Sequence, residues 1–229
     1  MSEIPDLSYI FFFIITKGLP TTLLLTAFGL IIGLILGLLL AIMRVYGSIE
    51  LNWLASFYEK IFRGIPLIIL IFLFAFGIPQ DFLWFIDPLQ RPLFSVILAL
   101  GLRSGAFQSQ IFRGAILSVN VGQMEAARAI GMKKLQAFQY IIFPQALRLS
   151  IPSWSNEYAV VIKDSSYAYA VGIIEITRST YYVFVSYPEL FFVSIGVLTI
   201  IYFAFTYPIT RIFGERQSKK LKEFGIGGV

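Results

Sequence analysis

Seven polar residues lie within long apolar stretches of the sequence and could do chemistry on a polar ligand. They are Arg103, Ser104, Asn156, Glu157, Lys163, Asp164 and Ser165. Ionisable groups in such stretches are costly in a bilayer and face protein or water by default. Glu157 and Asp164 are seven residues apart and therefore share one helix face, whereas Lys163 lies off that face.

Two carboxylates on one face could bind an ammonium or guanidinium group, and the Arg103 guanidinium could bind an α-carboxylate through paired hydrogen bonds. The alternative is that these groups pair between helices and hold them together. For Lys163, Asp164 and Ser165 we favour a structural or gating role; for Arg103 and Glu157 both interpretations stay open. If they bind a ligand, its pocket lies between the stretches that carry them.

The sequence lacks several kinds of reactive group. It has no histidine and no cysteine, which excludes disulfides, thiol nucleophiles, imidazole acid–base chemistry and the usual zinc ligands. It also has no glycine-rich loop ending in Gly-Lys-Ser/Thr, so ATP is not bound here in the usual way. We predict no catalytic residue, no metal site and no cofactor in this chain.

Composition indicates a membrane protein. Hydrophobic residues make up 58% of the 229 residues and charged residues 14%, and the mean hydropathy is +0.81. One soluble core of this size could not bury so much apolar surface. We expect a single membrane domain over residues 1–229.

The apolar runs predict an all-α protein with five transmembrane helices. The expected spans are residues 19–43, 65–78, 92–117, 152–174 and 190–212. The second span could begin earlier, near Trp53, with a bend at residues 63–66. The first carries Gly29, Gly33 and Gly37, a ridge of small residues that lets another helix approach closely. We expect residues 4–18 to form a separate interfacial helix that ends at residues 17–20.

Basic residues set the orientation. With the N-terminus outside and the C-terminus in the cytoplasm, the outer side carries only Lys17, Arg91 and Arg178 of the 18 Lys and Arg residues, while most of the others lie on the inner side. The net charge of +5 is therefore attributed to orientation rather than to nucleic-acid binding. Residues 118–150 then lie in the cytoplasm.

This cytoplasmic loop has the pattern of two short helices. Residues 125–130 are good helix formers, and Gly131 can end the helix. Residues 135–143 predict a second helix, which Pro144 should interrupt. We expect a helix–turn–helix at the membrane surface.

The spacing within the loop is specific. Glu125, Ala126 and Ala127 are followed at fixed distances by Gly131, Ile141 and Pro144, with Gly122 just before them. This resembles the E-A-A-x3-G-x9-I-x-L-P loop of ABC-importer permeases, with Phe143 in place of Leu. Residues 21–23, 62–67, 104–107, 111–114 and 163–166 are similar to permeases for polar amino acids. Gln110, where many relatives have Glu, and Tyr167, where Leu is common, depart from that pattern.

The resemblance implies a permease subunit of an ATP-driven importer in the cell membrane. Its partners would be two copies of an ATP-binding subunit, a second permease subunit (identical or similar) and an extracytoplasmic amino-acid-binding protein. ATP and Mg would be bound by the ATPase, which would grip the loop of Glu125 and move the attached spans.

Three other functions were weighed. A permease for another small solute is compatible with the loop. A self-sufficient secondary transporter would usually show internal repeats, and none is found in the sequence. A membrane enzyme would need a recognisable catalytic cluster, which the remaining Asp, Glu, Lys, Ser and Tyr residues do not form.

Overall fold

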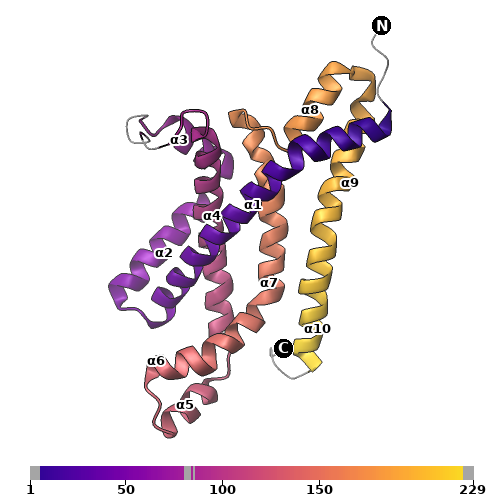
Figure 1. Ribbon diagram of the computed structural model, residues 1–229. Helices are drawn as coiled ribbons and strands as arrows, with labels where there is room; N and C mark the ends of the chain where they lie inside the picture. Colours follow the sequence, from indigo (N-terminus) through magenta and orange to yellow (C-terminus); the bar gives the residue numbers. More distant parts are fainter. Residues whose placement is uncertain (1–5, 80–83, 85, 224–229) are drawn as a thin grey trace.

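The computed structural model describes residues 6–79, 84 and 86–223, and all regular structure within them is helical (Figure 1). The first half contains α1 Leu7–Tyr46, α2 Ile49–Gly64, α3 Leu67–Phe76, α4 Arg91–Leu117 and α5 Val121–Ala129. The second half contains α6 Lys134–Ala137, η2 Phe138–Ile142, α7 Phe143–Asp164, η3 Ser165–Val171, α8 Ile176–Ser186, η4 Pro188–Leu190, α9 Phe191–Ile209, η5 Thr210–Glu215 and α10 Arg216–Glu223.

The long helices α1, α4, α7 and α9 run between the two ends of the molecule (Figure 1). Helix α1 runs diagonally past α4 and α7, and α9 runs alongside α7 (Figure 1). The short helices α5 and α6 lie toward the same end as α10, and α8 lies at the opposite end, beside the start of α1 (Figure 1). A buried apolar cluster around Leu25, Leu70 and Val96 joins α1, α3 and α4, and one around Ala41, Phe112 and Ile142 joins α1, α4 and η2.

Helix α1 is longer than the sequence predicted. It runs without interruption from Leu7 to Tyr46 with Pro20 inside it, so the prediction of a separate interfacial helix over residues 4–18 is wrong for the described residues 6–18. A proline in a helix removes one backbone donor and bends the axis, and packing can offset that cost. Gly18 provides such packing: a Cβ there would lie 2.6 Å from the Ile176 Cα at the start of α8.

The predicted glycine ridge is an interface within the chain. Gly29, Gly33 and Gly37 are buried and face α4, where added Cβ atoms would lie 3.0 Å from the Leu100 side chain, 2.5 Å from Gln108 and 2.7 Å from Gln108, respectively. Close backbone contact between α1 and α4 thus depends on these residues.

The predicted bend before the second apolar run is a complete break. Helix α2 ends at Gly64, Ile65 adopts an extended conformation (φ −88°, ψ 129°), and α3 begins after Pro66. An extended residue before proline is expected from steric contact with the proline ring. Helix α3, with 10 residues, is shorter than the predicted span 65–78.

The fourth predicted span, residues 152–174, starts later than the helix found in the structure. Helix α7 starts at Phe143, with Pro144 in its first turn and Pro152 inside it. Pro144 therefore does not interrupt the helical path, because the preceding turn is the π-helix η2, and the first turn of a helix needs no donor from proline. The path continues as η3 to Val171 and ends at Gly172, whose φ of 89° favours glycine.

By length and composition, two helical segments of the described chain can cross a bilayer: Leu7–Tyr46 and Pro188–Lys219, with Leu67–Phe76 as a shorter apolar helix. Helices α4 and α7 have 27 and 22 residues; α4 matches the third predicted span in place and α7 overlaps the fourth, but both carry polar groups of the candidate site. The structure therefore supports a helical membrane fold, without by itself fixing five spans.

Candidate functional site

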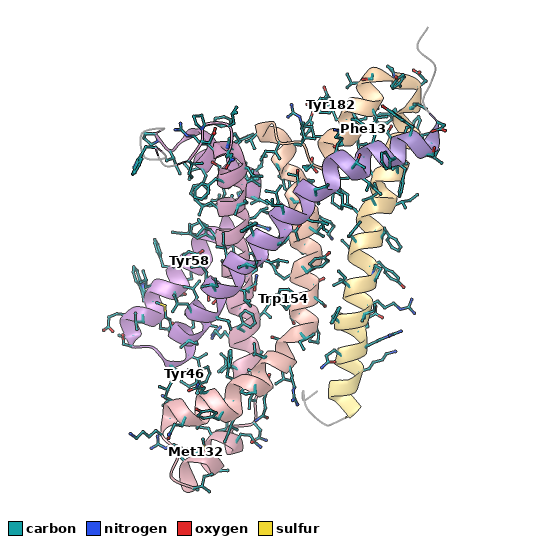
Figure 2. All side chains as sticks on the ribbon, in the orientation of Figure 1. Phe13, Tyr46, Tyr58, Met132, Trp154 and Tyr182 are labelled. Atoms are coloured by element: carbon teal, nitrogen blue, oxygen red, sulfur yellow. The ribbon has the colours of Figure 1, made fainter. Side chains whose placement is uncertain are left out.

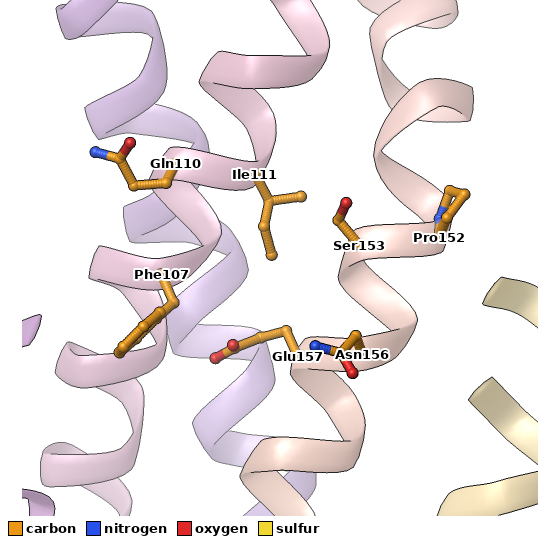
Figure 3. Close-up of a pocket in the computed structure, with 7 residues that line it drawn as sticks. All are labelled: Phe107, Gln110, Ile111, Pro152, Ser153, Asn156 and Glu157. Atoms are coloured by element: carbon orange, nitrogen blue, oxygen red, sulfur yellow. The ribbon is translucent and has the colours of Figure 1, made fainter. Parts of the chain in front are cut away.

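An open cavity of about 480 Å³ lies between α4 and α7. Its lining comes from both helices: Phe107, Gln110, Ile111, Pro152, Ser153, Asn156 and Glu157 (Figure 3). Of the predicted ligand-binding residues, Asn156 and Glu157 line it. A cavity thus exists where the sequence placed the pocket, between the third and fourth apolar stretches.

Glu157 is the ionisable residue of this lining. Its residue surface is 5% exposed, and Figure 3 shows its side chain extending from α7 toward Phe107. Ser104 donates a hydrogen bond of 2.7 Å to Glu157 Oε1. Within the described residues this is the one hydrogen bond to Glu157, which leaves Oε2 available at the cavity. A carboxylate with one oxygen that has no hydrogen-bond partner, in an open and mainly apolar cavity, can accept a charge-assisted bond from a cationic ligand.

Arg103 and Asp164 form an ion pair with each other. The Arg103 guanidinium donates to Asp164 Oδ2 and so joins α4 to the end of α7. Neither residue lines the cavity. Asp164 is paired with Arg103 in this structure, so the joint binding of one cationic ligand by Glu157 and Asp164 stays a prediction. The structural role favoured for Asp164 agrees with this pairing.

The other predicted residues are dispersed. Ser104 is buried and does not line the cavity, but it donates a hydrogen bond to Glu157, which does. Ser165 is buried, and its hydroxyl donates to the Ile162 carbonyl. Lys163 is exposed and lies off the Glu157 face, as its spacing predicted. Lys163 and Ser165 are not brought to the cavity.

Phe107, Gln110 and Ile111 line the cavity but were not predicted as ligand-binding residues. The Phe107 ring is flanked by two guanidinium groups, with Arg103 Cζ at 4.9 Å and Arg63 Cζ at 5.2 Å from the ring centroid. Gln110 donates to Glu59 of α2. Phe107, Gln110 and Ile111 follow Arg103 at helical spacing, so plotting α4 on a helical wheel would have grouped them.

The second candidate site is the hairpin formed by α5 and α6. Asn120 caps α5, accepting a 2.8 Å bond from the Gly122 amide. The helix ends at Gly131 (φ 88°), where the Met132 amide donates to the Ala127 carbonyl at 3.1 Å. This left-handed C-terminal motif favours glycine. The predicted first helix and its end at Gly131 are therefore confirmed.

The residues of the hairpin divide into an outer and an inner face. Glu125, Ala126 and Pro144 are exposed, and Met132 lies at the tip (Figure 2). Ala127 is 1% exposed, so it packs within the chain and offers no surface to a partner. Ile141 packs against the buried cluster of Ala41, Phe112 and Ile142, and thereby fixes the hairpin to α1 and α4.

The C-terminal end of α1 packs against the hairpin. The Tyr46 ring packs edge-to-face on Phe138 of η2 with 5.0 Å between centroids, and Lys134 Nζ lies 5.2 Å from the Tyr46 centroid (Figure 2). These contacts join the hairpin to a long helix and allow the two to move as one unit.

Comparison with known proteins defines the class. Residues 29–220 match the family of binding-protein-dependent transport system inner membrane components. The nopaline transport system permease protein NocM of Agrobacterium fabrum is 37% identical over 167 residues, covering 70% of this chain and 68% of that protein. The chain belongs to this family. It is a translocation subunit of an inner-membrane transport system rather than an enzyme.

Other similar proteins fall in the same class. The arginine ABC transporter permease protein ArtM of Haemophilus influenzae is 35% identical over 71% of this chain and 73% of its own. The glutamine transport system permease protein GlnP of Escherichia coli is 32% identical over 72% and 74%. Among solved structures, one described as an amino acid ABC transporter with histidines has a TM-score of 0.77 and 28% identity, covering 90% of this chain and 94% of that one.

Proposed function

We propose that this chain is the permease subunit of an ATP-driven importer for polar amino acids, with five transmembrane helices, the N-terminus outside and the C-terminus in the cytoplasm. The family membership and the named specificities of its relatives (nopaline, arginine and glutamine) support the transport class. The positions of α5–α6 and of α10 toward one end of the molecule, opposite α8 and the start of α1, support the topology (Figure 1).

The observation that carries the substrate class is Glu157. Its free Oε2 faces a cavity that also presents the Asn156 and Gln110 amides and the Phe107 ring. A carboxylate in a partly desolvated site attracts an ammonium or guanidinium group more strongly than in water. The amides can accept and donate hydrogen bonds to the rest of a polar amino acid.

The partners follow from the class. Two ATP-binding subunits would bind ATP and Mg, and one would contact the exposed face of α5 around Glu125 and Ala126. Gly122, Gly131, Ile141 and Pro144 would shape and anchor that hairpin. A second permease subunit, identical or similar, would complete the translocation path in the lipid bilayer, and a binding protein would deliver the amino acid outside.

A permease for another small solute is the second candidate. Its support is a likeness of fold: a methionine ABC transporter structure has a TM-score of 0.65 at 22% identity. Direct binding of solutes distinguishes the two candidates, because a cavity built around Glu157 should prefer ligands with a cationic group.

The test is the variant Glu157→Gln in the membrane complex isolated with its ATPase. We expect binding of radiolabelled L-arginine, measured without the binding protein, to weaken about tenfold, as for loss of one charge-assisted hydrogen bond. ATP-driven uptake should fall with it. The matched control is Glu50→Gln, because Glu50 is exposed and lies outside the cavity. Unchanged arginine binding and uptake in Glu157→Gln would refute the site.

A further inference from the structure

A chain of three hydrogen bonds, two of them buried and that of Trp154 partly buried, leads from Trp154 to the carboxylate of Glu157. Trp154 Nε1 donates to Gln108 Oε1 at 2.9 Å, Gln108 Nε2 donates to Ser104 Oγ at 3.0 Å, and Ser104 Oγ donates to Glu157 Oε1 at 2.7 Å. Gln108 and Ser104 are 0% and 1% exposed. Trp154 lies on α7 close to α4 (Figure 2) and is not part of the cavity lining. We call these four residues the relay.

Two groups with one possible role each set the direction of the bonds in the relay: the Trp154 indole N–H, which donates to Gln108, and the Leu30 carbonyl of α1, which accepts from it. An indole N–H can only donate, so the amide oxygen of Gln108 must face Trp154 and its NH2 group must face Ser104. Ser104 Oγ then accepts from Gln108, and its single proton is left for Glu157. Without the Trp154 donor, only the Leu30 carbonyl, which accepts from Gln108 Nε2 at 3.2 Å, would still favour this orientation of an amide whose oxygen and nitrogen ends have the same shape.

Helix α1 packs against Gln108 and Ser104 of the relay. The second proton of the Gln108 NH2 group is donated to the Leu30 carbonyl of α1 at 3.2 Å. A Cβ on Gly33 would lie 2.5 Å from Gln108 Nε2 and 2.8 Å from Ser104 Oγ. The backbone of α1 therefore lies directly against Gln108 and Ser104, and each polar atom of the Gln108 side chain has a partner in the structure.

The consequence for Glu157 is geometric. Because the relay delivers a proton donor to Oε1, that oxygen is occupied as an acceptor and the carboxylate is held in one orientation. Oε2 is left as the acceptor that meets a ligand. If Gln108 were turned over, its amide oxygen would compete for the Ser104 proton, and Glu157 would lose the bond that orients it.

We propose that Gln108, oriented by Trp154, is a positioning residue that acts through Ser104 to hold Glu157 ready for the cationic group of the transported amino acid. This inference rests on the proposed function, because it assigns Glu157 to ligand binding. It also means that ligand binding at Glu157 should alter the environment of the Trp154 indole, which does not line the cavity.

The first test is a double-mutant cycle on L-arginine binding to the isolated membrane complex. Trp154→Phe keeps an aromatic ring and removes the indole N–H. We expect it to weaken binding about fivefold, as for a hydrogen bond that acts at one remove, and to have no further effect when Glu157→Gln is already present. The matched control is Tyr58→Phe, which removes another hydrogen bond to α4, that of Tyr58 Oη to the Leu102 carbonyl at 2.8 Å.

The outcomes separate the two proposals. If Glu157→Gln leaves arginine binding intact, the ligand site itself is wrong. If Glu157→Gln weakens binding but Trp154→Phe behaves like Tyr58→Phe, the relay is wrong and the site stands. Equal effects of Trp154→Phe with and without Glu157→Gln would mean that Trp154 acts only on folding, which also overturns the relay.

A second measurement uses the unaltered protein, in case Trp154→Phe does not fold. The sequence has three tryptophans, so the indole N–H resonance of Trp154 can be assigned in variants with Trp53 and Trp84 replaced by Phe. We expect L-arginine to shift this resonance in the wild type and not in Ser104→Ala, which breaks the relay. A resonance unmoved by saturating L-arginine in the wild type contradicts the proposal.

Discussion

At the scale of single residues, the ion pair of Arg103 and Asp164 separates a structural role from a ligand-binding one. The two side chains are 22% and 17% exposed, and the pair links α4 to the end of α7. Removing one partner of a mostly buried pair leaves the other charge uncompensated, which costs more than removing both. The pair is therefore expected to behave as a fixed link between two helices.

We predict that Arg103→Met and Asp164→Asn each destabilise the protein by about 2 kcal/mol, and that the double variant is less destabilised than the sum of the two. Thermal unfolding of the purified protein in detergent measures this. If Arg103 instead bound the ligand carboxylate, Arg103→Met would abolish arginine binding and leave stability nearly unchanged.

At the scale of elements, close packing of α1 on α4 is decided by its glycines. Gly33 has no room for a Cβ, whereas a Cβ on Gly196 of α9 would meet nothing within 4 Å. The same substitution at the two positions should therefore have opposite effects.

Gly33→Ala should lower the free energy of unfolding by about 2 kcal/mol through overpacking. Gly196→Ala should leave it unchanged or raise it by up to about 1 kcal/mol, because alanine is the better helix former. Unfolding midpoints of both variants in the same detergent provide the comparison. Equal midpoints would mean that α1 and α4 are not in close contact.

The α5–α6 hairpin makes a prediction of its own. Ile130, at the end of α5, is 78% exposed, an apolar side chain that a partner could cover. Ile130→Glu should reduce co-purification of the ATPase subunit about tenfold. Leu89, which is 90% exposed in the segment before α4, provides the control, and Leu89→Glu should leave co-purification intact. Full recovery of the ATPase with Ile130→Glu would place the contact elsewhere.

At the scale of the whole molecule, the proposed topology predicts that the end with α8 faces outside the cell and the end with α5 faces the cytoplasm. Because the sequence contains no cysteine, single cysteines can be labelled without background. In intact cells or spheroplasts, a membrane-impermeant maleimide should label Val185→Cys on α8, where Val185 is 54% exposed. Ile130→Cys should be labelled only after permeabilisation. The opposite pattern would reverse the proposed orientation.

Much of the fold was predictable from local patterns. The apolar runs indicated a helical membrane protein, residues 92–117 matched α4 almost to the residue, and the spacing from Glu125 to Gly131 gave the end of α5. The prolines led to wrong helix boundaries. The sequence predicted a boundary at Pro20, Pro144 and Pro152, but all three lie within helical paths. Proline lowers helix stability locally, but contacts between helices decide whether the helix continues.

The sequence by itself determined the class of the protein, because hydropathy, charge distribution and motif spacing are properties of neighbours along the chain. Only the tertiary structure decided the partners of its polar groups. Arg103 meets Asp164 across 61 positions, and Gln108 meets Trp154 across 46. Such pairings depend on the rotation and height of one helix against another, set by close contacts such as that of Gly33, and no local periodicity encodes them.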